Sequence, residues 1–162
     1  MRTLAGWIAL TPELSAKLLL GGQVWDCAQH ADLWGKRLPE LRALAQVSEA
    51  PNEVFVEFMD RLEAPEAWDE TLERLTGVYQ VLKPHLIETY EAHLARANPI
   101  YEPPTRRILE RCLADERRHI ADGIRVLESL GGTDAQRARI AAWETELRGL
   151  LAAAGGVTGD RR

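Results

Sequence analysis

Glu116 and His119 stand three residues apart in a segment with a strong helical pattern, a spacing that places both side chains on one side of a helix. Apolar residues recur at helical spacing in the segment 101–130 and form one stripe; they are Leu109, Cys112, Leu113, Ile120, Ile124 and Leu127. Glu116 falls at the centre of this stripe and His119 on its flank. A buried carboxylate is costly unless it is paired, hydrogen-bonded or bound to metal. An inward Glu/His pair of this kind is one way in which helical bundles hold iron or manganese.

A second group of potential ligands surrounds His30. Asp26 and Cys27 precede His30 by about one helical turn and share its helix face, which is apolar at its ends and polar in its middle. This pattern is typical of a bundle core that holds a site. The thiols of Cys27 and Cys112, combined with the imidazoles, would suit zinc better than a pair of irons.

Each of these candidates also has a purely structural explanation. Glu116 and His119 can form a hydrogen-bonded pair without a metal, and His30 can be a core histidine bonded to Asp26 or Glu116. Cys27 can act as a small buried hydrophobic residue. The residue types therefore leave ligation and simple hydrogen bonding open.

Composition restricts the class of protein. The 162 residues carry a formal net charge of −5, so there is no basic footprint for nucleic acid. No apolar run approaches the roughly 18 residues needed to span a bilayer, and the N-terminus lacks the pattern of a secretory signal. The two cysteines cannot build a disulfide framework, which makes a reducing cytoplasm the expected location.

Prolines, glycines and capping residues divide the chain into helices that must position these side chains. We predict a single all-α domain over residues 1–154 and a flexible tail over 155–162. The first long helix is expected to start at Thr11-Pro12 and to bend at Gly21-Gly22. The four principal helices are predicted at about 11–46, at 66–97 with a bend at Pro84, at 103–130, and at 133–154 with Thr133 as N-cap.

The connections between these helices carry topological information. Short turns near 98–103 and 131–133 predict antiparallel neighbours. The connection 47–65 is longer, about 19 residues, and contains a short apolar run that we interpret as a short helix. It can travel the length of the bundle and leave the first two long helices parallel. A simple up-down bundle with one long loop is the alternative.

Two short motifs resemble those of the ferritin-like superfamily. The segment Trp25-Asp26-Cys27-Ala28-Gln29-His30-Ala31-Asp32 resembles a motif of the form Trp-Asp-Glu-x-x-His-Ala-Glu, and Asp115-Glu116-Arg117-Arg118-His119 is similar to the closing Asp-Glu-x-x-His. The resemblance implies a ferritin-like four-helix bundle with one long crossover connection and a di-iron carboxylate ancestry. It also implies that His30, Glu116 and His119 are metal ligands.

The chain departs from that pattern at several positions. Cys27 stands where the first motif has a glutamate, and the single glutamates of two further helices have no counterpart. On the second long helix the core stripe passes through leucines, with His85 at its edge but near the axial level of Glu116. The helix that normally precedes the first motif is missing. The resemblance therefore implies an incomplete metal site, with Cys27 and His85 as further candidate ligands.

Two functions remain open from the sequence. The first is a binding or scaffold protein that kept the bundle and binds at most one transition-metal ion (iron, manganese or zinc) or none. The alternative is a metal-dependent oxidoreductase or hydroxylase acting on a small organic substrate. A homodimer in which a second subunit completes the site is also compatible with the sequence, and no small-molecule ligand is indicated.

Overall fold

The computed structural model describes residues 1–43 and 49–159, and every regular element within them is helical. This confirms the prediction of an all-α chain. In chain order the elements are α1 (Arg2–Leu10), α2 (Leu14–Glu40), α3 (Glu53–Glu63), α4 (Thr71–Thr76), the π-helical segment η1 (Gly77–Leu82), α5 (Lys83–Arg96), α6 (Pro103–Leu130) and α7 (Asp134–Ala153).

The last two helices follow the local signals closely. α6 begins at Pro103 and ends at Leu130. The next residue, Gly131, adopts φ +67°. α7 starts with a capping box, in which the Thr133 hydroxyl accepts from the Gln136 N–H and the Gln136 side chain accepts from the Thr133 N–H. These boundaries confirm the predicted ones. Local signals were sufficient here because a helix cap depends on neighbouring residues alone.

The N-terminal part of the prediction was wrong in its boundaries. A short helix, α1, occupies Arg2–Leu10, and α2 begins only at Leu14, with Glu13 as N-cap in place of Thr11. The helix continues without interruption through Gly21-Gly22, where a bend was predicted. It ends at Glu40, and the predicted end near residue 46 lies outside the described residues.

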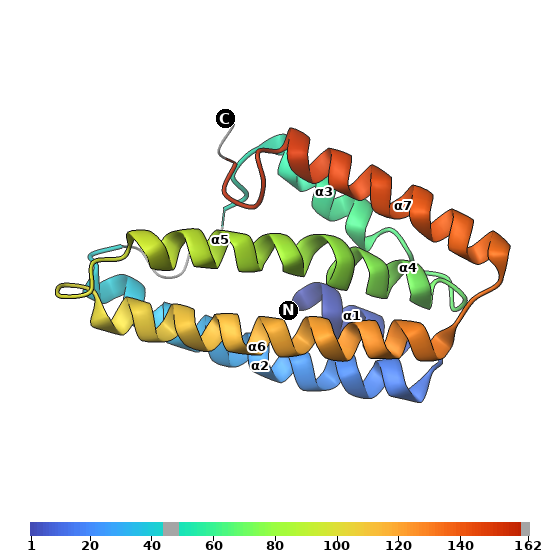
Figure 1. The fold of residues 1–162 in the computed structure, drawn as a ribbon, viewed down its shortest axis with the longest axis horizontal. Coiled ribbons are helices and arrows are strands. Elements are labelled where there is room, and N and C mark those ends of the chain that lie inside the picture. The colour runs from blue at the N-terminus through green and yellow to red at the C-terminus, as the bar shows by residue number, and fades with distance from the viewer. Residues whose placement is uncertain (44–48, 160–162) are drawn as a thin grey trace.

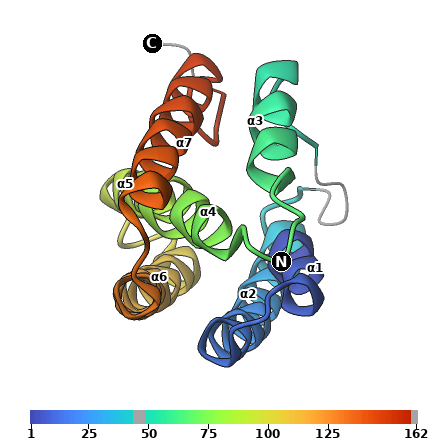
Figure 2. The same cartoon turned by 90° about the vertical axis from the view of Figure 1, so that its right-hand side faces the viewer.

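The second long helix lies at the centre of the molecule. α4, η1 and α5 form one continuous rod that starts at Thr71, five residues later than predicted, and residues 71–79 are all buried. Viewed along the helices, α4 lies between α3 and α7 on one side and α1, α2 and α6 on the other (Figure 2). The arrangement is therefore larger than the four principal helices that we predicted, because α1 and α3 also cover the central rod.

Large apolar side chains from several helices pack around this rod. Leu75 and Tyr79 of the rod are fully buried, and the residues packed with them include Leu20, Phe58, Leu62 and Leu147. The long connection contains α3, which confirms the short helix predicted there. α3 packs against α7. Within the described residues, none of the helices is both long and apolar enough to cross a bilayer.

Helix directions follow from the colour gradient in Figure 1. α2 and α5 run in the same direction, whereas α6 runs opposite to both and α7 runs opposite to α6 (Figure 1). The chain between α2 and α4 includes α3, a short helix that runs in the direction opposite to α2 and α5 (Figure 1). α6 consequently packs as an antiparallel neighbour of both α2 and α5.

The residues after α7 form consecutive turns as far as residue 159. Asn52 Nδ2 donates to the Ala154 carbonyl at 2.9 Å, and the Val157 N–H donates to His85 Nε2 at 3.2 Å. The Val157 contact joins part of the predicted tail to α5, and the Asn52 contact joins the residue before that tail to the N-cap of α3. Residues 160–162 lie outside the described residues.

Candidate functional site

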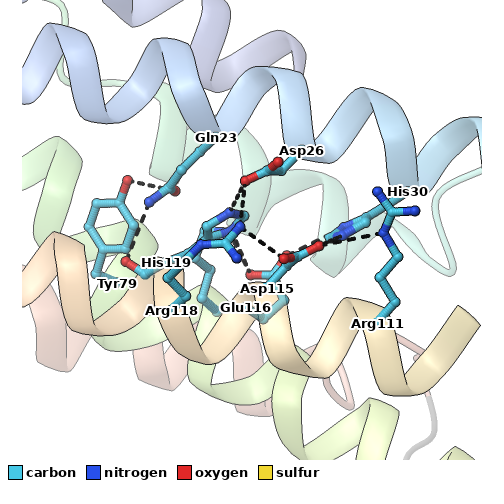
Figure 3. Close-up of polar contacts among 10 residues, drawn as sticks. Gln23, Asp26, His30, Tyr79, Arg111, Asp115, Glu116, Arg118 and His119 are labelled. Atoms are coloured by element: carbon cyan, nitrogen blue, oxygen red, sulfur yellow. Dashed lines mark hydrogen bonds and ion pairs between the residues drawn. The ribbon is translucent and has the colours of Figure 1, made fainter.

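α2 and α6 each contribute one histidine and one aspartate to a pair of interhelical contacts. His30 Nε2 of α2 lies 2.9 Å from Asp115 Oδ2 of α6, and His119 Nε2 of α6 lies 2.9 Å from Asp26 Oδ2 of α2 (Figure 3). His30 and His119 are buried, as the helical pattern predicted. The two helices run antiparallel, so the two motifs meet side by side.

A lysine that the sequence analysis did not consider occupies the middle of this cluster. Lys83, the first residue of α5, places its Nζ 2.5 Å from Glu116 Oε2 and 3.0 Å from His119 Nδ1. Lys83 and Glu116 are each 3% exposed and His119 is 1% exposed. The six residues Asp26, His30, Lys83, Asp115, Glu116 and His119 are called the buried network below.

The two ring nitrogens of His119 face different partners. An Nε2–H that donates to Asp26 leaves the Nδ1 lone pair free to accept from the Lys83 ammonium. His30 has the same orientation, since its Nε2 faces Asp115 and its Nδ1 lies 4.0 Å from Glu116 Oε1. Both histidines thus turn Nδ1 toward Glu116 and Nε2 toward an aspartate.

Glu116 and Asp26 are held in their ionised form. Burial by itself would raise the pKa of Glu116, but its contacts with His119 and with the Lys83 ammonium outweigh burial and lower the pKa. Burial likewise opposes ionisation of Asp26, and contacts with His119 and Arg118 bring its pKa below the usual value. Arg118 also pairs with Asp115 at 2.8 Å, so it joins both aspartates at the surface.

A chain of neutral contacts supports the position of His119. Gln23 Nε2 donates to the His119 carbonyl at 3.4 Å, and the Tyr79 hydroxyl donates to Gln23 Oε1 at 2.8 Å (Figure 3). The Tyr79 ring lies directly over Gly123 of α6, where an added Cβ would come within 2.2 Å of the ring. Burial raises the pKa of Tyr79, so the phenol remains protonated.

The two cysteines behave as buried thiols. Cys27 is partly buried against the hydrophobic core, and burial raises the pKa of its thiol. Burial also raises the pKa of Cys112 to about 11, although a hydrogen bond with Trp34 acts in the opposite direction. Both side chains are therefore thiols at neutral pH, whereas metal ligation requires the thiolate.

His85 does not join the other candidate ligands. Its Nε2 accepts the hydrogen bond from the Val157 N–H, and its Nδ1 lies 3.6 Å from Glu88 Oε2. The ring lies against Gly156, where an added Cβ would approach its Nε2 to 2.3 Å. His85 therefore contacts the turns after α7, and Lys83 is the residue of α5 that reaches Glu116.

No family model, curated protein or solved structure matches this chain.

The transition-metal ion that the resemblance implies would need ligand atoms that the Lys83 ammonium already contacts. Glu116 Oε2 and His119 Nδ1, two of the implied ligand atoms, both contact the ammonium of Lys83. Within residues 1–43 and 49–159, no group of three or more His, Cys, Asp or Glu side chains is arranged to hold a metal ion. With the ammonium in this position the residues do not fit a metal, because a cation already contacts the central carboxylate.

Surface pockets lie away from the buried network. A pocket of about 700 Å³ is lined by residues of α5 and of the turns after α7, including His85 and Arg96. Another of about 500 Å³ lies between α5 and α6 and includes Glu91 and Arg117. Neither pocket is lined by a residue of the buried network.

Proposed function

We propose that this chain is a ferritin-like helical-bundle protein that serves as a binding or scaffold protein, in which the Lys83 ammonium takes the place of a metal ion. The observation that carries the proposal is the position of Lys83 Nζ, within hydrogen-bonding distance of Glu116 Oε2 and His119 Nδ1. A lysine supplies one positive charge and directed N–H donors, but it offers no open coordination position and no redox chemistry.

The topology supports the ferritin-like part of the proposal. The parallel α2 and α5 are joined by a long connection that includes α3, the arrangement expected of a bundle with one long crossover. The motifs around His30 and Glu116 lie on α2 and α6, which are adjacent antiparallel helices.

The role proposed for the buried network is to set the register of three helices. Its members come from α2, α5 and α6, and each charge has its partner on another helix or one turn away. A displacement of one helix by a single residue would separate several of these pairs in a buried environment. Buried polar groups have this role in some proteins, and it requires no substrate and no access from solvent.

Metal content tests the proposal. We expect wild-type protein, purified aerobically and analysed by elemental analysis, to hold no stoichiometric transition metal. We expect Lys83→Ala to bind up to one Zn²⁺ per chain, because removal of the ammonium leaves Glu116 and the Nδ1 atoms of His30 and His119 without a cation.

The double variant Lys83→Ala/Glu116→Gln is the control for that gain, and it should bind no zinc. Two irons per wild-type chain, lost in both Glu116→Ala and His30→Ala, would contradict the proposal. Zinc in the wild type that is lost in Cys27→Ser would also contradict it and would indicate a thiolate site.

One observation favours the alternative of a metal-dependent oxidoreductase or hydroxylase. Metal-ligating histidines usually direct their second ring nitrogen to a carboxylate, and His30 and His119 both do so. This function requires Lys83 to leave Glu116. A single iron in wild-type protein that is lost in His30→Ala would favour it over the scaffold.

A further inference from the structure

Three large apolar side chains lie exposed on one face of α2. Leu14 and Leu18 are each 68% exposed and Trp25 is 66% exposed. At about 100° per residue these positions fall within roughly 40° of arc, so they form a single stripe along the helix. Leu10, at the end of α1, is 39% exposed just before it. This group of four is called the α2 stripe below.

The α2 stripe is the uncovered side of a helix that is otherwise packed. The opposite face of α2 is buried and carries Gln23, His30 and Arg37. α2 lies at the edge of the helix arrangement, with α1 and α6 beside it (Figure 2). The exposure of the stripe is therefore not a consequence of an isolated or unpacked helix.

We propose that the α2 stripe is the interface between two copies of this chain, packed as an antiparallel helix pair about a two-fold axis near residue 23. This inference does not depend on the buried network. Two-fold dimers are the commonest oligomers and require a surface that fits itself.

Large and small residues alternate along this face of α2. Gly21 and Gly22 lie one turn before Trp25, and a Cβ added at either would meet nothing within 4 Å. In an antiparallel pair centred near residue 23, the Trp25 ring of each copy lies over this glycine pair of the other. Leu18 then faces Ala28 of the other copy, so Trp25 and Leu18, the large side chains nearest the axis, each meet small residues.

The exposed apolar area of the α2 stripe matches what a dimer interface needs. The exposed parts of the four side chains add roughly 400–500 Å² of apolar surface per copy. A standard interface takes about 800 Å² from each partner, of which a little over half is apolar. The stripe thus supplies about the apolar area that one side of such a dimer needs, and the residues beside it supply the polar rim.

Opposite charges would meet at the two ends of the α2 stripe in such a dimer. Asp32 and Lys36 continue the same face beyond Trp25 and form an ion pair at 2.6 Å. In the proposed register Asp32 lies opposite Leu14 of the other copy, at the N-terminus of its α2. Among the described residues that N-terminus has no side-chain cap and no acidic residue in its first turn. A carboxylate from the second copy would interact favourably with its free N–H groups.

Oligomeric state tests the interface. We expect the wild-type chain to sediment as a dimer at tens of micromolar, and Leu18→Glu and Trp25→Ala to sediment as monomers with unchanged helical circular dichroism. Ile100→Glu is the matched control, since Ile100 is 76% exposed in the turn between α5 and α6; it should remain a dimer. A monomeric wild type, or a dimer that persists in Leu18→Glu, would overturn the proposal.

Disulfide trapping tests the antiparallel register, in a Cys27→Ser background. Gly22→Cys lies close to the proposed axis, so the two thiols come within about 4 Å of each other along the helices and should form a reducible covalent dimer. Ala28→Cys places its two copies about 15 Å apart along the helices and should not. A parallel pair would link both variants equally, and that result would overturn the register.

Discussion

At the scale of single residues, the Lys83–Glu116 pair places two opposite charges inside the folded chain. Both side chains are only 4% exposed, and their charges lie 2.5 Å apart. Desolvation of two such ions costs several kcal/mol, which mutual attraction offsets only when further hydrogen bonds complete the geometry. His119 completes it on the lysine side, since its Nδ1 accepts from the same ammonium.

The lowered pKa of Glu116 makes stability depend on pH. Because Glu116 binds its proton less readily in the folded chain than in the unfolded one, ionised Glu116 contributes stability above its unfolded pKa of about 4.3. This contribution is lost as the pH falls from about 5 through the lowered folded pKa. We expect Glu116→Gln to have an unfolding free energy about 3–5 kcal/mol lower than that of wild type at pH 7. On acidification, the unfolding free energy of this variant should fall by less than that of wild type.

Urea denaturation followed by circular dichroism between pH 3 and pH 7 measures both effects. Glu146→Gln is the control, because the pKa of Glu146 is also lowered, by Arg61, but at an exposed position. Its stability at pH 7 should stay close to wild type. Equal acid dependence in Glu116→Gln and wild type would contradict a role for ionised Glu116.

At the scale of elements, the π-helical segment η1 determines which side chain of α5 enters the buried network. A π turn closes its hydrogen bond on the fifth residue instead of the fourth. It therefore holds one more residue and sets every later residue back by about one helix position, roughly 100°. Lys83 consequently takes the inward position that an uninterrupted α-helix would give to Leu82.

Close contact between η1 and α6 depends on Gly123. A Cβ there would lie within 2.2 Å of the Tyr79 ring, which cannot move freely because it is 1% exposed and bonded to Gln23. We expect Gly123→Ala to lower the unfolding free energy by about 1–3 kcal/mol through overpacking. Chemical denaturation measures the change.

Gly149→Ala provides a control of opposite sign. Gly149 is an exposed position within α7, and an added Cβ meets nothing within 4 Å. Alanine should stabilise the helix by about 0.5–1 kcal/mol there. A stable Gly123→Ala variant would show that Tyr79 does not limit the approach of α6.

At the scale of the whole molecule, Arg74 joins segments that are distant in sequence. Its guanidinium is fully buried and donates to the carbonyls of Leu10, Pro65 and Ala67 and to the Thr11 hydroxyl. One side chain of α4 thus binds both the end of α1 and the loop after α3. Burial lowers the pKa of Arg74, although not enough to remove its charge near neutral pH.

Removal of this guanidinium should loosen α1. We expect Arg74→Met to lower the unfolding free energy by at least about 3 kcal/mol, because several buried acceptors lose their donor, and to reduce the hydrogen-exchange protection of α1. Urea denaturation and hydrogen exchange give the two readouts. Arg125→Met, at an exposed ion pair, should change neither, and unaltered protection of α1 in Arg74→Met would contradict the assigned role.

Much of this organisation follows from the sequence by itself. The starts and ends of α6 and α7, the helix within the long connection and the burial of His30, Glu116 and His119 follow from periodicity and capping. These features depend on residues within one or two turns of each other. The short helix α1 was missed because its nine residues lack a clear start signal and an acidic first turn.

Only the tertiary structure decided which charges meet. His85 and Lys83 are two residues apart, and a regular helix would bring His85 nearer the core, whereas η1 rotates Lys83 inward and His85 contacts the turns after α7. The π turn, in place of a regular turn, is found where Tyr79 of η1 packs against Gly123 of α6. No local pattern marks that choice, so the ligands could be proposed from the sequence but the cation beside them could not.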